Sequence, residues 1–136
     1  MRQAIYDYIR ALPAATLGTY SLSSELPYSA SGTPLYLKNF KKIYVGVDQI
    51  NQDSQIDTLD GSGAVDEITT VRVYFVTDAK LLPSNYDQLV QAIKEARTTA
   101  AISGVRQRLC QVSADFQDDA LITEFEFSFR TLITNQ

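Results

Sequence analysis

The chain has 136 residues, of which 45% are hydrophobic and 21% charged, and these proportions predict a single globular domain over residues 1–136. Its net charge of −4 disfavours a sequence-specific nucleic-acid-binding protein, because such proteins bind phosphates through clustered basic residues. The sequence has no histidine and a single cysteine, Cys110, which excludes an internal disulfide and leaves few residues for zinc binding or nucleophilic catalysis.

The first predicted element is a helix that ends at Pro13, whose ring clashes with the preceding turn. Its apolar residues recur at intervals of three and four, on one helical face: Ala4, Ile5, Tyr8, Ile9 and Leu12. Charges interrupt this segment, and no stretch of the chain reaches the ~20 apolar residues that span a bilayer, so we expect no secretion signal and no membrane partner. Residues 14–39 are rich in Ser, Thr, Gly and Pro and predict an extended segment with a short edge strand near residues 20–22.

Residues 42–48 are predicted to form the first core strand, because apolar side chains alternate along it. The next stretch, residues 49–66, shows no periodicity, and no Lys or Arg occurs between Ile43 and Val71. Its uncompensated carboxylates repel one another, so we expect a mobile acidic loop over residues 49–66. The acidic residues of this region are Asp48, Asp53, Asp57, Asp60, Asp66 and Glu67.

Residues 68–76 are predicted to form the second core strand, with Val71, Val73 and Phe75 on its buried face. A second helix should begin after Ser84, an N-cap residue with an acidic side chain three positions later. Gly104 should end this helix, since glycine tolerates the left-handed closing conformation.

The last two predicted strands, residues 105–114 and 121–133, should form a hairpin. Closure around Gln117 would place Arg108 opposite Glu126 and Cys110 opposite Glu124. The order of elements, α–β–β–α–β–β, predicts an α+β fold with a mainly antiparallel four-stranded sheet and two helices packed on one face.

Catalytic, metal and cofactor sites find little support in the sequence. Asp60, Gly61 and Glu67 fit three positions of a calcium-binding loop, but the positions that need acidic ligands hold Ile56 and Thr58. A solvated turn is therefore the better interpretation, and we expect no metal and no cofactor. The serines have no histidine to deprotonate them, so we expect no enzyme.

The basic residues of the strands should lie on the sheet face away from the helices, mixed with acidic and aromatic side chains. The candidate contact residues are Arg72, Tyr74, Arg106, Arg108, Glu124, Glu126 and Arg130. A solvated polar face and a subunit interface both explain such a surface. An RNA-binding sheet is a third interpretation, but it requires exposed aromatic residues on the central strands, where only Tyr44 and Tyr74 qualify.

The layout of the whole chain resembles the tail terminator (tail completion) proteins of long-tailed bacteriophages. The similarity rests on the short N-terminal helix, the strand at residues 43–47, the acidic loop that leads into residues 70–76, the opening of the second helix at residues 83–89, and the alternating aromatic residues of the last strand. The resemblance implies a homohexameric ring on the head-proximal end of the tail tube of a virion. Such a ring stops tube polymerisation and offers a docking surface for the head.

The resemblance also implies the partners of the chain: further copies of itself, the tail tube protein, and a head-completion or neck protein. Assembly would take place in the host cytoplasm, and DNA would pass through the ring without specific binding. We expect Asp53, Asp57 and Asp60 to contact the tube or to line the channel. A head–tail joining (neck) protein of the same virion and a small ferredoxin-like binding module remain as alternative functions.

Overall fold

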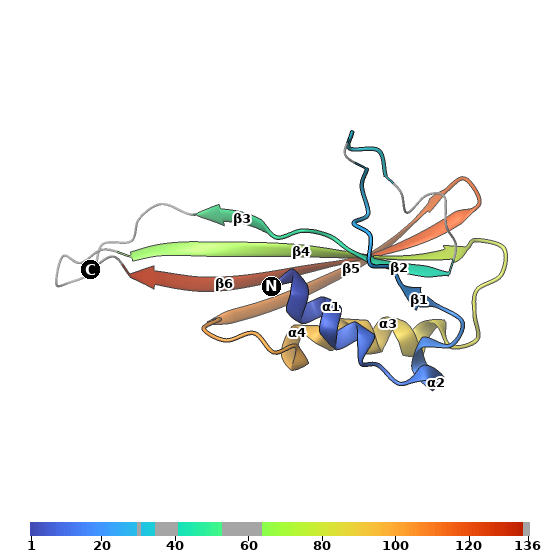
Figure 1. Ribbon diagram of the computed structural model, residues 1–136, viewed down its shortest axis with the longest axis horizontal. Helices are drawn as coiled ribbons and strands as arrows, with labels where there is room; N and C mark the ends of the chain where they lie inside the picture. The colour runs from blue at the N-terminus through green and yellow to red at the C-terminus, as the bar shows by residue number, and fades with distance from the viewer. Residues whose placement is uncertain (30, 35–40, 53–63, 135–136) are drawn as a thin grey trace.

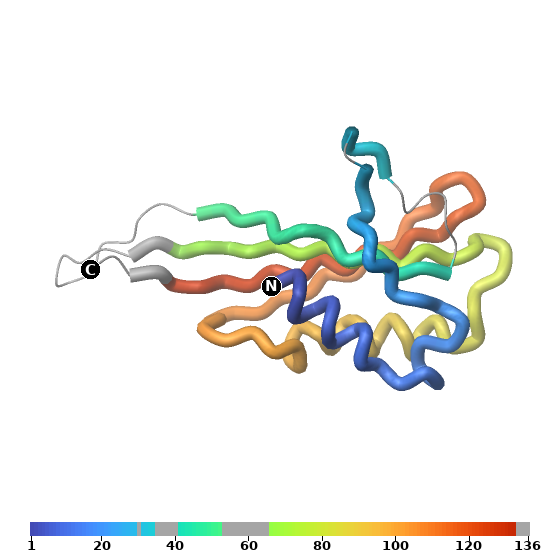
Figure 2. Tube along the Cα trace, viewed as in Figure 1, coloured from blue at the N-terminus to red at the C-terminus, as the bar shows by residue number. Residues whose placement is uncertain are grey.

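The structure is a computed structural model that describes residues 1–29, 31–34, 41–52 and 64–134 (Figures 1 and 2). Within these ranges it is an α+β fold with four helices and one six-stranded, mostly antiparallel sheet. The strands in their order across the sheet are β1 (Ser21–Leu22), β2 (Lys42–Val45), β4 (Ala64–Asp78), β6 (Ala120–Thr134) and β5 (Gln107–Gln117), and β3 (Gln49–Gln52) pairs with β4 beyond the end of β2. β1 and β2 are parallel, and every other pair is antiparallel.

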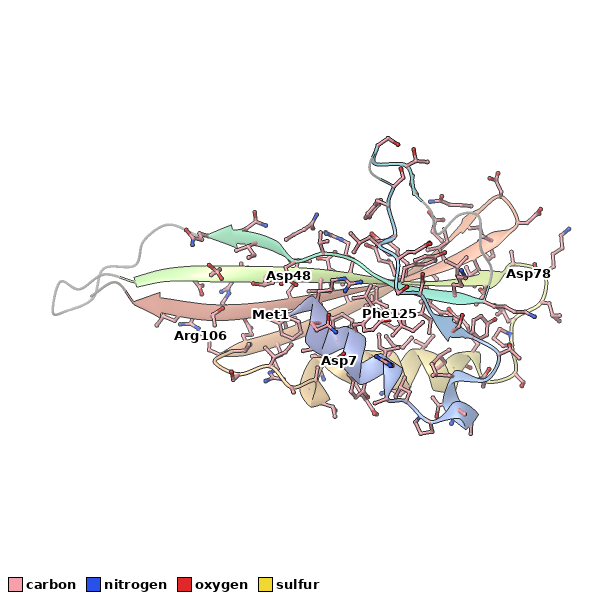
Figure 3. The ribbon with its side chains drawn as sticks, in the orientation of Figure 1. Met1, Asp7, Asp48, Asp78, Arg106 and Phe125 are labelled. Carbon is pink, nitrogen blue, oxygen red and sulfur yellow. The ribbon has the colours of Figure 1, made fainter. Side chains whose placement is uncertain are left out.

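The helices lie along one side of the sheet (Figure 1), and we call the sheet surface beneath them the helix face. They are α1 (Arg2–Arg10), α2 (Ala14–Leu17), α3 (Tyr86–Lys94) and α4 (Ala96–Thr99). The main core lies between the helices and this face, and it contains Ile5 and Ile9 of α1 together with Leu89 and Ile93 of α3. The strands contribute a row of fully buried side chains: Ile43, Val45, Val71, Val73, Phe75, Phe125, Phe127 and Phe129. Figure 3 shows Phe125 within this layer.

The opposite surface of the sheet, which we call the outer face, has a buried apolar cluster at one end. Tyr44, Tyr74 and Ile122 belong to a small buried cluster there. Tyr28 reaches this cluster, and its hydroxyl group lies 2.5 Å from the hydroxyl group of Tyr74. The chain after β1 therefore crosses onto the outer face and covers its apolar end.

The other end of the sheet extends beyond the helices (Figures 1 and 2). We call this part the distal arm; it consists of β3, residues 64–70 of β4 and residues 128–134 of β6. The N-terminus lies where the helical layer ends, and the amino group of Met1 forms an ion pair of 2.9 Å with Asp48 (Figure 3). The arm thus begins just beyond the point at which α1 is tied to the sheet.

The sheet contains the four predicted core strands, the short edge strand expected near residues 20–22, which is β1, and one strand that was not predicted, β3. β1 has only two residues, and β3 has the polar sequence Gln-Ile-Asn-Gln, which carries no strand pattern of its own. β3 is a strand because it pairs with β4, so the sequence of β3 itself does not predict it. β3 also shortens the predicted acidic loop of residues 49–66, of which residues 53–63 lie outside the described ranges. The helix α2 interrupts the predicted extended segment of residues 14–39, whereas β1 is the short edge strand expected there.

The prediction of two helices was also wrong. α2 follows Pro13, and the second predicted helix is divided into α3 and α4, which ends at Thr99 rather than at Gly104. Ala100 is already extended, with φ −60° and ψ 140°. Two successive β-branched residues, Thr98 and Thr99, weaken the helix at this point because their side chains are restricted in a helical turn.

The hairpin between β5 and β6 closes between Asp118 and Asp119 rather than around Gln117. Asp118 and Asp119 form a two-residue turn between Gln117 and Ala120. Asp118 has a left-handed backbone with φ 54°, a conformation that Asp tolerates better than most residues. The shift changes the pairing by three positions: Arg108 lies opposite Phe129 instead of Glu126, and Cys110 lies opposite Phe127 instead of Glu124.

Candidate interaction surface

A charged cluster occupies the middle of the outer face, where the register of β4 and β6 sets Arg72 beside Glu126 and Tyr74 beside Glu124. The Nε atom of Arg72 lies 3.2 Å from Glu124 Oε1, and its Nη2 atom lies 3.5 Å from Glu126 Oε2. The guanidinium group also donates a hydrogen bond to Gln49 of β3. All three charged side chains are about one-third exposed, so each ion pair contributes about 0–1 kcal/mol and mainly fixes side-chain positions.

A second ion pair lies on the distal arm, and one of its members is buried. Arg130 Nε is 3.3 Å from Asp66 Oδ2, and Asp66 is only 5% exposed. Its other oxygen, Oδ1, has no hydrogen-bond donor in the described part of the chain. A buried carboxylate depends strongly on its counter-ion, so loss of Arg130 would cost more than loss of a partner in the exposed cluster.

Two hollows flank these charges on the outer face. The first is lined by Ile68, Gln107, Leu109, Ser128 and Arg130 on the distal arm. The second lies at the other end and is lined by Tyr28, Gly46, Val47, Gln49, Arg72 and Tyr74. Gly46 permits a close approach there: its N–H donates to the carbonyl of Arg72 at 2.7 Å, and a Cβ atom would lie 3.1 Å from that oxygen.

The structure brings together five of the seven strand residues predicted as contacts: Arg72, Tyr74, Glu124, Glu126 and Arg130. Tyr74 is buried beneath Tyr28 and does not contribute free surface. Arg106 is exposed just before β5, where its N–H donates to the carbonyl of Arg130 (Figure 3). Asp53, Asp57 and Asp60 lie outside the described residues.

Arg108 is on the helix face, contrary to the sequence prediction, because the three-position shift in register reverses the side of the sheet. Its guanidinium group donates to the carbonyl oxygens of Arg97 and Ala100 at 3.3 and 3.4 Å. It also donates to Thr98 at 3.5 Å and to Ile102 at 2.5 Å. Arg108 therefore binds carbonyl groups at the end of α4 and in the residues directly after it.

Sequence reasoning missed Gln49, Asp66 and Tyr28 as members of this surface. Gln49 and Asp66 were assigned to the acidic loop, although both belong to strands, and Tyr28 was assigned to the extended segment. Residues 66, 68, 70 and 72 share one face of a strand, and this alternation could have predicted that β4 begins before Ile68.

The described residues contain neither a group of side chains that could hold a metal ion nor a helix that could span a membrane. Cys, Asp and Glu side chains do not gather there in a group of three or more that could hold a metal ion. The helices in the same ranges are too short or too polar to cross a membrane.

Comparison with protein-family models and with curated proteins finds no match for this chain. Among solved structures, it is similar to a chain in the virion of a native gene transfer agent particle. The two chains are 18% identical with a TM-score of 0.57, and the match covers 99% of this chain and 95% of the other. At this identity the similarity shows a shared fold, and it extends over nearly the full length of both chains.

Proposed function

We propose that this chain is a structural protein of a phage-like virion rather than an enzyme. In this role it forms a homohexameric ring on the head-proximal end of the tail tube, where it ends tube polymerisation and provides the surface to which the head docks. Its partners are further copies of itself, the tail tube protein and a head-completion or neck protein. The full-length fold similarity to a chain of a gene transfer agent virion supports the virion part of this proposal.

The distal arm is the feature of the structure that most favours a subunit of a larger assembly. Thr69 and Phe129 at the base of the arm are buried in the core, but beyond them no helix of the described ranges covers either surface of the sheet (Figure 1). Isolated two- or three-stranded extensions are only marginally stable in water, so such an arm is expected to pack against a neighbouring molecule. Its Asp66–Arg130 pair and its apolar residues Ile68 and Leu132, together with Leu109 of the adjacent β5, give that neighbour a specific surface.

The charge of the chain is compatible with passage of DNA through the ring. Each copy carries a net charge of −4, and like charge repels the phosphate backbone. Arg72 would otherwise attract phosphates, but Glu124 and Glu126 neutralise it within the outer-face cluster. We assign Asp53, Asp57 and Asp60 to the channel or to the tube contact.

The ring is tested by light scattering coupled to size exclusion, over a wide range of protein concentration, with negative-stain electron microscopy of the largest species. The expected species has six times the 15.1 kDa mass of one copy and a ring-shaped projection. A tight dimer whose mass does not depend on concentration would contradict a hexameric ring.

The position in the virion is tested by removing the gene from the virus that encodes the chain and measuring its tails by electron microscopy. Loss of a terminator gives tails longer than normal and without heads. Tails of normal length that fail to join heads would instead identify a neck protein. Replacing Asp53, Asp57 and Asp60 together by Asn should disturb tail length or head joining, and normal virions would exclude the acidic residues from both contacts.

A further inference from the structure

Within the described ranges, neither lateral edge of the sheet pairs with a further strand, and both edges carry exposed apolar side chains. On one edge, β5 is eleven residues long, and Leu109, Val112 and Phe116 are 50%, 38% and 67% exposed. On the other edge, all four residues of β3 are exposed, and the Ile50 side chain is 58% exposed. Isolated exposed apolar residues are common, but two apolar sheet edges on one small protein require an explanation.

β5 lacks the features that normally protect an edge strand from pairing. It contains no proline and no lysine, and its acidic residue Asp115 lies next to the turn. Its one basic residue, Arg108, is bound to the carbonyl groups at the end of α4 and does not face outward. The edge is therefore suited to pairing with another strand.

The strand directions determine how a second copy fits. β3 is antiparallel to β4, β4 to β6, and β6 to β5, so β3 and β5 run in opposite directions at the two edges. A neighbouring copy in the same orientation therefore presents its β3 antiparallel to β5, and the alternation of the sheet continues across the boundary. Ile50 and Val112 both lie on the helix face, because they pair with Thr69 and Phe125 of that face. Through Thr69 and Phe129, Ile50 is level with Arg108, so a neighbour shifted by about four residues along the strands places Ile50 opposite Val112 on the same side of the joined sheet.

We propose that β5 of one copy pairs with β3 of the next copy in an antiparallel manner, so that a continuous sheet joins the subunits. The contact uses two different surfaces of each molecule, which is the kind of interface that closes into a ring when the rotation between subunits allows it. Backbone hydrogen bonds hold the edges together, and the Ile50, Val112 and Phe116 side chains become buried on one side. This inference rests on the proposed ring and identifies the surfaces that build it.

The hairpin turn indicates which residues of β5 direct their backbone N–H groups to the open edge. Gln117 and Ala120 flank a two-residue turn and therefore exchange hydrogen bonds with each other. Hydrogen-bonded and non-hydrogen-bonded pairs alternate along an antiparallel ladder. Counting back from Gln117, the N–H groups of Val112 and Ala114 therefore point away from β6. Proline at position 114 would thus remove a donor from the edge and leave the bonds to β6 in place.

The test uses two variants with complementary defects and one control. Ala114→Pro blocks the β5 edge, and Ile50→Lys places a charge on the β3 edge. Ala101→Pro is the matched control, because Ala101 is exposed outside the strands and Ala100 before it is already extended, as a residue before proline prefers. Thermal unfolding of each variant establishes that it folds, and light scattering measures its mass against concentration.

We expect each blocked variant alone to need at least about tenfold more protein for half-assembly than wild type, a change of about 1.4 kcal/mol. An equimolar mixture of the two should form a dimer and nothing larger, since each pair retains one intact β5 and one intact β3. Dimers of Ile50→Lys alone would overturn the proposal in favour of β5–β5 pairing. If both variants form rings as readily as the wild type, the edge contact is overturned while the proposed function stands. If the wild type forms a dimer whose mass does not change with concentration, both the edge contact and the proposed ring are overturned.

Discussion

Three residues that are buried or half-buried retain their protons more tightly in the folded chain. Burial raises the pKa of the Cys110 thiol above its ordinary value of 9.0, although Lys94 and Arg97 act in the opposite direction. Burial also raises the pKa of Tyr8 and of Tyr20, and the nearby carboxylates of Glu95 and Asp78 add to the shift. All three groups are neutral when protonated, so the folded state disfavours their ionisation.

This effect predicts a loss of stability in alkaline solution. The unfolded chain releases these protons first, so the contribution is fully present below the ordinary pKa values and is lost as the pH rises through the folded ones. We expect Tm to fall between about pH 8.5 and pH 10.5, and to fall less steeply in Cys110→Ala. Thermal unfolding by circular dichroism at half-unit pH steps measures both slopes, and identical slopes would show that the thiol contributes nothing.

At the scale of elements, Arg108 connects the end of α4 to the edge strand β5. Its guanidinium group bonds to carbonyl oxygens that the helix end leaves without an intrahelical donor. We expect Arg108→Ala to lower the free energy of unfolding by about 1–3 kcal/mol. Arg108→Lys should recover only part of this loss, because a compact ammonium group cannot reach several carbonyls at once.

Urea unfolding measures these differences, and Arg106→Ala is the matched control. Arg106 is exposed, and its bond to the sheet comes from the backbone N–H, which alanine retains. The control should change stability by less than about 0.5 kcal/mol. Equal losses in both alanine variants would mean that the end of α4 does not depend on Arg108.

Arg108 also shows where local sequence patterns cease to be informative. Alternation along residues 71–75 and 125–129 correctly predicted which side chains form the core of the sheet. The pairing of β5 with β6, however, depends on the turn at Asp118, and an error of three positions moved Arg108 from the helix face to the outer face. Alternation determines the faces of one strand, but only the turn determines how two strands align.

The charged cluster of the outer face was predictable from the alternation of side chains within single strands. Arg72, Glu124 and Glu126 occupy positions of the central strands that alternate with core residues, so their shared face follows from the pattern alone. β3 and Tyr28 were not predictable, because Gln49–Gln52 and the segment around Tyr28 take their positions from β4 rather than from their own composition.

At the scale of the whole molecule, net charge and edge pairing oppose each other. Every copy carries a charge of −4, so subunits brought together in a ring repel one another. The edges join instead through backbone hydrogen bonds and apolar side chains, which salt screens little. Assembly should therefore become easier as salt is added, in contrast to an interface built from ion pairs.

We expect the concentration of half-assembly to fall as ionic strength rises from about 0.01 M to about 1 M, over which the screening length decreases from about 30 Å to about 3 Å. Light scattering at each salt concentration measures it. Replacing Asp53, Asp57 and Asp60 by Asn removes three negative charges and should weaken this dependence. If added salt instead dissociates the ring, intersubunit ion pairs dominate, and the Arg72, Glu124 and Glu126 cluster becomes the first contact to examine.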